Sequence, residues 1–508
     1  SMTRFISDPR YSRPIDVHRW SDHPEVKALV EDLWEGYLPE EITGKAGEKG
    51  RPGPKPKTSF KKQLRVLILD LYVAWLDDPE LSIGVSMSPN AWKTNRRYNA
   101  LHLSQILIPI IKALHAAGLL DLAKGSYSGP RAKGNRTTRI RASEELQIKF
   151  REAKFIRDDV TRFEGEEIII LRDAKEANKV GKEVEYVDTA ETIAMREELK
   201  AYNDLLAASF IDIATLDKPV IEVDPEIEAS HVHINADTAR SRRVFSRSSW
   251  EMNGRFYGGW WQRVNGDWRS KIFIDDQPTI EVDFKGLHVA MLYAKAGVEM
   301  QDDPYDLPLT LFQAYPPELT RKLVKQLVLT AINAKKKSSA YSAFRESFPS
   351  AHRGKSMKND ELDRLLGVFL EKNPPLSDHL FTDQGIHLMY LDSQITAHVH
   401  RHFTKQGIPI LSVHDSYIID HMRVAELRDV MAEASKAVMG ISLPTAIKLP
   451  DMPEYENVTD EQLQDHIENR KGLRCVGYME RVFTYQERTG RKISPVVRGD
   501  AKELHRIM

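Results

Sequence analysis

The stretch IEVDFKGLHVAMLYAKAG, residues 280–297, combines two periodicities that decide the expected fold. Ile280 and Val282 flank a single acidic residue, which predicts a short strand that delivers Asp283 at its end. The residues that follow are apolar at helical spacing: Leu287, Ala290, Met291 and Ala294. An isolated aspartate after a strand is commonly a turn or cap residue, so its interpretation depends on two further stretches.

The second stretch is QGIPILSVHDSYIID, residues 406–420, and it predicts a hairpin with a carboxylate at its tip. An apolar strand from Ile408 to Val413 meets a tight turn at His414-Asp415, and the chain returns as a strand. An apolar strand seldom ends in an acid without a specific role. The hairpin therefore makes Asp415 a second candidate carboxylate.

The third stretch is TRKLVKQLVLTAINAKKK, residues 320–337, and its spacing predicts a helix. Arg321, Lys325, Leu329 and Asn333 recur every four residues, so they lie close to one helical face. Two cations at this spacing are usually a solvated helix face when they occur alone. The functional interpretation rests on the conjunction of all three stretches, because their order, the secondary structure they predict and their spacing agree.

Together the three stretches resemble motifs A, B and C of the family A DNA polymerases and single-subunit RNA polymerases. The resemblance implies a right-hand polymerase palm built on an antiparallel sheet, with helical fingers. Asp283 and Asp415 would then be the catalytic, metal-binding carboxylates. Arg321 and Lys325 would hold the incoming triphosphate, and His414 would lie near the primer terminus.

Two positions outside these motifs extend the resemblance. Gly254-Arg255-Phe256-Tyr257 resembles the Gly-Arg element before motif A, whose arginine contacts the primer–template. Gln394, on the helix before motif C, resembles the glutamine of that family, although it lies closer to His414 in the sequence. Arg255, His414 and Gln394 are thus the expected primer–template residues.

Three departures concern the choice of sugar. His288 stands where DNA polymerases of this family carry a glutamate that excludes ribonucleotides. Asn333-Ala334 replaces the usual aromatic residue and glycine at the end of motif B, so His288 and Asn333 are the candidate sugar-selection positions. The sequence His-Asp-Ser at residues 414–416 is the RNA polymerase form of motif C.

Nucleotidyl transfer explains why these residue types are needed. Two Mg²⁺ ions about 4 Å apart activate the 3′-hydroxyl and stabilise the leaving pyrophosphate. Magnesium prefers oxygen ligands, which carboxylates at neighbouring strand ends can supply. Cations one helical turn apart neutralise charge that develops on the phosphates. We therefore expect two Mg²⁺ ions, a DNA primer–template and dNTP or NTP as cofactors and partners.

Residues 59–150 resemble a winged helix-turn-helix module, in which a helix enters the major groove and a basic hairpin contacts phosphates. Arg139 and Arg141 lie in the wing-like strand. Arg242 and Arg243 belong to the densest basic and aromatic stretch of the chain, together with Trp260 and Trp261. The expected DNA-binding residues are Arg139, Arg141, Arg242 and Arg243. The alternative is a surface arginine cluster over partly buried tryptophans.

Length and composition fit a multidomain α/β (α+β) protein. The chain has 508 residues, a net charge of −1 and a single cysteine, Cys475. A single cysteine excludes an intramolecular disulfide and a cysteine-based zinc cluster, and it favours a reducing, cytoplasmic setting. No apolar run reaches the ~18 residues of a membrane span, so none is expected. The predicted organisation begins with an N-terminal segment and basic linker at 1–58, a winged-helix-like domain at 59–150 and a helical thumb-like connector at 151–235. A palm follows at 236–450, with fingers at about 297–385, and a C-terminal helical appendage occupies 451–508.

The expected function is template-directed nucleotidyl transfer. The first hypothesis is a compact family A-like DNA polymerase without proofreading, of phage or mobile-element type, because no acidic exonuclease signature precedes the palm. The second is an RNA polymerase or primase-like enzyme of the same superfamily. The third is a DNA-binding replication initiator with an inactive palm.

Overall fold

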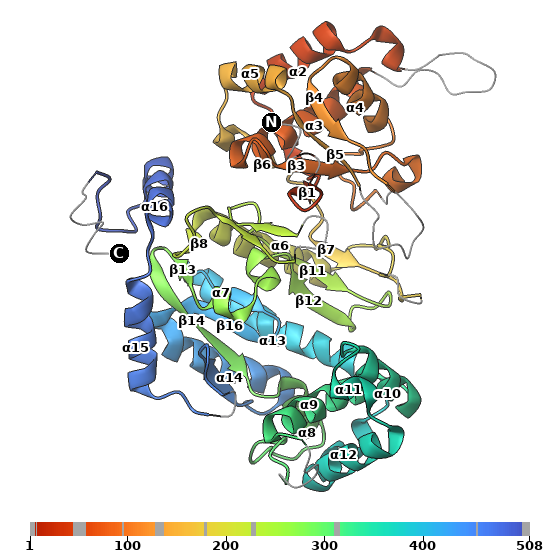
Figure 1. Ribbon diagram of the computed structural model, residues 1–508, viewed down its shortest axis with the longest axis vertical. Coiled ribbons are helices and arrows are strands. Elements are labelled where there is room, and N and C mark those ends of the chain that lie inside the picture. The colour runs from red at the N-terminus through yellow and green to blue at the C-terminus, as the bar shows by residue number, and fades with distance from the viewer. Residues whose placement is uncertain are drawn as a thin grey trace, which may run out of the picture. The chain divides into compact units, whose positions relative to one another are not determined.

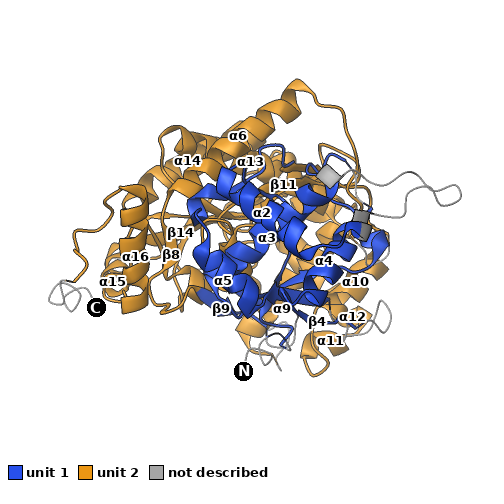
Figure 2. Ribbon diagram, turned by 90° about the horizontal axis from the view of Figure 1, so that it is seen from above, with its two compact units in different colours: residues 1–167, 220–232 blue, residues 168–219, 233–508 orange. Residues whose placement is uncertain are grey.

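This computed structural model describes residues 6, 8–43, 57–93, 96–126, 137–176, 180–224, 230–308, 315–453 and 456–499. The chain forms two compact units, coloured separately in Figure 2. Unit 1 comprises residues 1–167 and 220–232, and unit 2 comprises residues 168–219 and 233–508. The expected mixed class, with helices and antiparallel sheets, is confirmed. Within the described ranges, every helix is too short or too polar to cross a membrane.

Unit 1 is built on a four-stranded sheet in the order β1-β3-β5-β4. Strand β1 is parallel to β3, and the other pairs are antiparallel. The strands are β1 Ser12–Pro14, β3 Ser82–Val85, β4 Leu120–Ala123 and β5 Thr138–Ala142, with the short pairs β2 Arg19–Trp20 and β6 Thr161–Arg162, and β9 Val220–Glu222 and β10 His231–His233. The helices are α2 Pro24–Tyr37, α3 Lys57–Asp77, α4 Leu107–Ala116 and α5 Glu144–Glu152.

Helix α3 forms the centre of this unit. It is buried on most sides, as expected for a helix with apolar residues all round. Its buried apolar residues join those of α2, α4 and the sheet in one core: Leu64, Leu67, Ile68, Leu71, Val30, Leu33, Ile110, Leu114, Ile83 and Ile140. Residues 8–43, predicted as a separate N-terminal segment, therefore belong to unit 1. The basic linker at 44–58 lies almost entirely outside the described residues, which resume at Lys57.

A buried ion cluster fixes the N-terminal residues onto α3. Asp70, whose side chain is fully buried, accepts hydrogen bonds from Arg13 at 2.8 Å and from Arg19 at 2.7 Å. Asp16 lies beside this group and pairs with Arg162 at 2.5 Å. Burial alone would raise the pKa of Asp16, but the guanidiniums of Arg162 and Arg19 outweigh burial and hold the pKa well below its usual range.

The lowered pKa of Asp16 predicts acid sensitivity of unit 1. Ionised Asp16 stabilises the fold at neutral pH, and this contribution is lost as the pH falls below about 4, the ordinary aspartate pKa. We expect Asp16→Asn to lower the free energy of unfolding by about 2 kcal/mol at pH 7, with a smaller difference from wild type at pH 3. Urea unfolding at both pH values measures this, with the exposed Asp22→Asn as the control. A difference that stays constant with pH would contradict the assignment.

Unit 2 is built on a six-stranded antiparallel sheet with the path β15-β16-β14-β13-β8, to which β17 is added through β14. These strands are β8 Ile211–Ile213, β13 Ile272–Ile274, β14 Gln277–Phe284, β15 Leu411–Val413, β16 Ser416–Asp420 and β17 Thr445–Lys448. A three-stranded sheet in the order β12-β11-β7 lies beside helix α13 in Figure 1. Its strands are β7 Ile169–Leu171, β11 Arg242–Phe245 and β12 Asn253–Tyr257.

Most helices of unit 2 belong to one of two groups that pack together in space. Helices α6 Ala190–Ala208, α13 Gly385–Lys405 and α14 Val424–Met439 pack together and against the sheets. Helices α9 to α12 gather near α8, which directly follows β14 (Figure 1). Residues 297–385 are thus largely helical where described, as the fingers prediction requires: α9 Pro317–Asn333, α10 Lys337–Glu346, α11 Arg353–Ser356 and α12 Asn359–Lys372. The remaining helices are α7 Gly266–Arg269, α8 Leu287–Lys295, α15 Asp460–Lys471 and α16 Val476–Thr489.

The C-terminal helices are part of the core of unit 2. Helix α16 buries one face against β8 and β13, in a cluster that includes Phe210, Phe273, Tyr478, Met479 and Val482. The Tyr478 hydroxyl donates a hydrogen bond of 2.8 Å to Asp276. The predicted appendage at 451–508 is therefore helical, but its described helix α16 completes the core on which the sheet rests.

Candidate active site

Strand pairing brings Asp283 and Asp415 to the same edge of the large sheet. Asp283 lies near the end of β14, directly opposite Ser416 on β16. The Phe284 amide donates a hydrogen bond of 3.1 Å to the Asp415 carbonyl, which fixes the neighbouring backbones. Both aspartates line one cavity of about 420 Å³. The two aspartates predicted from separate stretches of sequence thus line the same cavity.

The turn that carries Asp415 has an unusual backbone. Val413 pairs with Ser416, so His414 and Asp415 alone connect β15 to β16. His414 has a φ of 55°, a left-handed conformation that is uncommon for residues other than glycine and is often found at functional sites. Burial lowers the pKa of His414, and the Arg255 guanidinium lowers it further, so the imidazole is neutral at neutral pH. The Tyr257 ring packs against it edge to face, with centroids 5.6 Å apart.

A buried carboxylate holds two of the predicted site residues together. Asp392, on α13, accepts hydrogen bonds from Arg255 at 3.0 and 2.5 Å and interacts with His288 at 2.9 Å. Its side chain is only 1% exposed. A carboxylate in this position fixes both side chains in the wall of the cavity that contains Asp283 and Asp415.

Sequence reasoning missed Asp392 and selected its neighbour Gln394 instead. Gln394 does not line this cavity, and its amide donates a hydrogen bond of 2.9 Å to the Tyr390 hydroxyl. A signal for Asp392 was nevertheless present. Asp392, Thr396 and His400 are polar residues at spacings of four on an otherwise apolar face of α13, and all are buried. Polar residues repeated on an otherwise apolar helix face indicate positions with a specific role.

A single glycine, Gly254, allows Arg255 to reach Asp392. Gly254 has a φ of 88°, and a Cβ there would lie 2.9 Å from Ser393 Oγ and 2.7 Å from the Phe245 ring. A larger residue would require the Phe245 ring and the Ser393 side chain to move, and its backbone would be strained at this φ. The Gly-Arg element thus has a physical basis, because Gly254 permits the close approach that presents Arg255 to Asp392.

The predicted triphosphate residues face a second cavity, of about 230 Å³, that adjoins the first. The two cavities share Asp283, Gly286, Tyr305 and Lys325. Arg321 pairs with Asp303 at 2.7 Å, and the cations of Arg321 and Lys325 lie 5.8 and 5.4 Å from the centroid of the Tyr305 ring. Asp303 and Tyr305 were not predicted, because they lie outside the three motif-like stretches.

The remaining sugar-selection candidate lies at the end of α9. Asn333 is exposed and lines the larger cavity together with Lys325 and Leu329. It also packs closely on Gly385, the first residue of α13. His288 and Asn333 therefore line the same cavity, as the sequence-based assignment requires.

The charge of Asp415 depends on its burial and on two neighbouring charged groups. Burial raises the pKa of Asp415, the Arg255 guanidinium opposes this shift, and the nearby Asp392 carboxylate adds to it. Among the described residues, no group of three or more histidines, cysteines or acids could hold a metal ion. Two carboxylates nevertheless fit Mg²⁺, which usually keeps several waters and takes one or two protein carboxylates plus substrate phosphates. Asp283 and Asp415 are therefore the candidate magnesium ligands.

No protein-family model matches this chain, and a search of curated proteins finds no match. The residues and their geometry therefore carry the functional proposal.

The structure corrects the set of predicted DNA-binding arginines. Arg139, Arg141 and Arg243 are 4%, 2% and 3% exposed, so none of them presents its side chain on the outer surface, where a DNA backbone would bind. Arg141 pairs with Asp121 at 3.2 Å, and Arg139 donates to the Ile6 carbonyl at 3.2 Å. We withdraw these three residues from the predicted DNA contacts, whereas the exposed Arg242 remains a prediction.

The aromatic part of that stretch is also structural. Trp260 and Trp261 are buried, and the Trp261 indole donates a hydrogen bond of 3.0 Å to the Ser412 carbonyl on β15. They cannot stack on bases from this position. Instead, Trp261 supports the strand that leads to Asp415.

Proposed function

We propose that this protein is a template-directed nucleotidyltransferase, most specifically a compact family A-like DNA polymerase without proofreading. One observation supports the proposal above all others. Asp283, Asp415, Arg255 and Lys325 come from four separate elements of the chain, and all four line one cavity. The resemblance selected these four residues before their positions in space were known. Chance is therefore a poor explanation for their meeting in one cavity.

In this proposal the large sheet of unit 2 is the palm. Strands β14 and β16 place the two aspartates at one edge, and helices α9 to α12 are the fingers. Arg321 and Lys325 on α9 face the cavity that Asp283 shares. The resemblance to motif B assigns this helix to the fingers.

The chain's own residues perform defined tasks in the proposed reaction. Asp283 and Asp415 would hold Mg²⁺, which would supply activation of the 3′-hydroxyl and stabilisation of the leaving group. Lys325 and Arg321 bind the triphosphate and neutralise charge on its oxygens. Asp392 orients Arg255 toward the primer–template, and neutral His414 presents its imidazole beside Asp415 without repelling a metal ion.

The triphosphate assignment predicts a defect in nucleotide binding. We expect Lys325→Ala to raise the KM for nucleotide about tenfold or more, because a charge-assisted contact with phosphate contributes about 1.5–3 kcal/mol. Steady-state incorporation kinetics measure this. Lys322→Ala removes an exposed cation from the same helix and is the matched control. Equal KM values for the two variants would contradict the role of Lys325.

His288 favours a second candidate, an RNA polymerase or primase-like enzyme. A glutamate that excludes ribonucleotides is absent from this position, and His288 is instead held by Asp392. The Ser416 that follows Asp415 is also the RNA polymerase form of motif C. A replication initiator with an inactive palm is the third candidate, and it does not explain why all four site residues are retained in one cavity.

The testing experiment compares four dNTPs with four NTPs in Mg²⁺, each with and without a DNA primer on a single-stranded template. Extension of the primer by dNTPs supports the DNA polymerase. Preferential use of NTPs, or synthesis without a primer, supports the RNA polymerase or primase. DNA binding without any synthesis under all four conditions would contradict the enzymatic proposal and favour the initiator.

We further propose that unit 1 is a DNA-binding module of the winged-helix type. Helix α4 is followed by the antiparallel strands β4 and β5, and this succession of a helix and a hairpin supports the proposal. The loop between β4 and β5, where the wing is expected, lies largely outside the described residues. A DNA-binding module joined to a polymerase would suit a replication protein of a phage or mobile element.

A further inference from the structure

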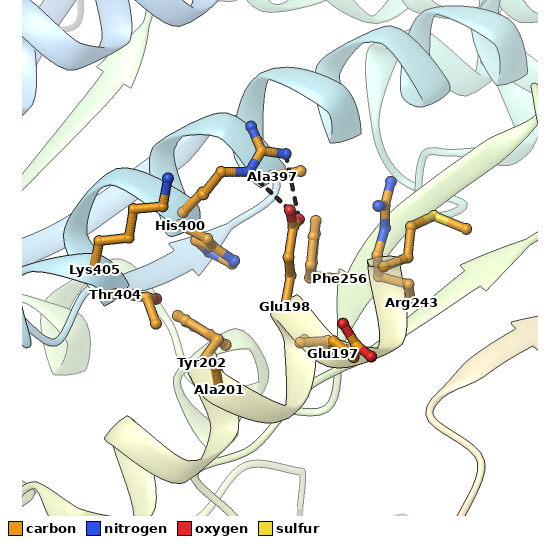
Figure 3. Close-up of a pocket in the computed structure, with 13 residues that line it drawn as sticks. Glu197, Glu198, Ala201, Tyr202, Arg243, Phe256, Ala397, His400, Thr404 and Lys405 are labelled. Carbon is orange, nitrogen blue, oxygen red and sulfur yellow. Dashed lines mark hydrogen bonds and ion pairs between the residues drawn. The ribbon is translucent and has the colours of Figure 1, made fainter. Parts of the chain in front are cut away.

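A separate cavity of about 430 Å³ lies in unit 2 between helices α6 and α13. It shares no residue with the two cavities of the candidate active site. Figure 3 shows side chains from α6, α13 and β12 around it. Much of its wall is apolar or aromatic: Met195, Leu199, Tyr202, Phe256 and Ala397. A volume of this size accommodates a small organic ligand.

Two buried polar groups in the wall lack hydrogen-bond partners among the described residues. His400 is fully enclosed, and neither of its ring nitrogens is hydrogen bonded. Its ring stacks on Tyr202 with centroids 4.0 Å apart, and burial lowers its pKa to about 3, so it is neutral and carries one N–H donor. The Thr404 hydroxyl is also unpartnered. Unsatisfied buried groups are costly, which indicates that a ligand satisfies them.

Arg243 adds a buried positive charge to the same wall. Its guanidinium donates to the Gly254 carbonyl at 2.9 Å and to the Ser393 hydroxyl at 3.1 Å, and it packs on the Phe256 ring at 4.7 Å. Burial lowers the pKa of Arg243 to about 10, so it remains charged at neutral pH.

Arg243 has no carboxylate partner among the described residues. Glu198, the nearest candidate in the cavity wall, is instead paired with Arg401 at 2.9 Å. A buried guanidinium that contacts only neutral oxygens and rings is poorly compensated. An anionic group in the cavity would supply the missing charge.

We propose that this cavity binds a small aromatic anion, with the ring against the aromatic wall and the anionic group toward Arg243. The wall also contains Lys405, the Arg401–Glu198 ion pair and the exposed Glu197, so its cations outnumber its carboxylates by three to two. A neutral arene would leave the guanidinium uncompensated, and a cation would be repelled by it. The Arg243 side chain contacts Gly254 and Ser393, which are the chain neighbours of Arg255 and Asp392. Arg243 therefore links this cavity to the candidate active site.

The test uses 2-naphthoate as the probe and its neutral amide, 2-naphthamide, as the chemical control. Calorimetric titration of the full chain should show one site for 2-naphthoate and at least about tenfold weaker binding of the amide, the value of one charge-assisted contact. Ala201→Trp places a large side chain at an exposed position in the cavity wall and should abolish binding. Ala207→Trp, exposed on the same helix but outside the cavity, should leave binding unchanged.

Three results would overturn the proposal. Equal affinity for the acid and the amide would remove the role of Arg243. Undiminished binding to Ala201→Trp would place the probe outside this cavity, and no binding of 2-naphthoate at millimolar concentration would exclude the site. The measurement needs no catalysis, so its outcome is independent of the proposed nucleotidyl transfer.

Discussion

Asp415→Asn should reduce nucleotide incorporation by about 10³-fold or more while primer–template binding is retained. Asparagine preserves the size of the side chain but removes the negative charge that the proposed function assigns to Mg²⁺ binding with Asp283. Loss of one metal-binding carboxylate removes several kcal/mol of transition-state stabilisation, and about 4 kcal/mol corresponds to a factor of about 10³. Single-turnover incorporation of one nucleotide measures the chemical step directly.

The burial of Asp415 makes a control for folding necessary. Asp429→Asn removes an exposed carboxylate from α14 in the same unit and should leave the rate unchanged. Circular dichroism and primer–template affinity should match wild type in both variants. Incorporation at more than one tenth of the wild-type rate in Asp415→Asn would remove this residue from the proposed mechanism.

Asp392→Asn should destabilise unit 2 by about 3 kcal/mol and should also impair incorporation. The substitution leaves the largely buried Arg255 charge without its carboxylate, and breaking a buried ion pair from one side is strongly destabilising. His288 loses its partner at the same time. Urea unfolding of the full chain measures the change in stability.

A double variant separates charge burial from general damage. Arg255→Met in addition to Asp392→Asn removes the uncompensated charge, so the pair should be more stable than Asp392→Asn alone. Glu487→Gln breaks the exposed pair with Arg498 and should cost less than 1 kcal/mol. If the double variant is no more stable than Asp392→Asn, the loss does not come from an unpaired guanidinium.

Much of the site was predictable because its residues lie in local patterns. The strand that ends at Asp283 and the turn at His414-Asp415 are both visible as short periodic stretches, and the structure brings their carboxylates to one sheet edge. Lys325 was identified through the resemblance of residues 320–337 to motif B, because two cations at helical spacing are by themselves usually a solvated helix face. Local periodicity predicts an element and the face on which a residue lies.

Contacts between distant segments were not predictable in the same way. Asp392 meets Arg255 across 137 positions of sequence, and no local pattern near either residue identifies the other. Arg243 was assigned to the surface because arginines are usually exposed, whereas its strand faces α13 and the side chain is buried there. Such errors arise because tertiary packing decides which face of a strand is covered.

The most direct test of the central claim is primer extension by wild type and Asp283→Asn in the presence and absence of Mg²⁺. The proposal predicts template-directed extension by wild type that requires Mg²⁺ and is lost in Asp283→Asn, while Asp429→Asn extends normally. Extension by Asp283→Asn at the wild-type rate, or no synthesis by wild type on any primer, template and nucleotide combination, would contradict it.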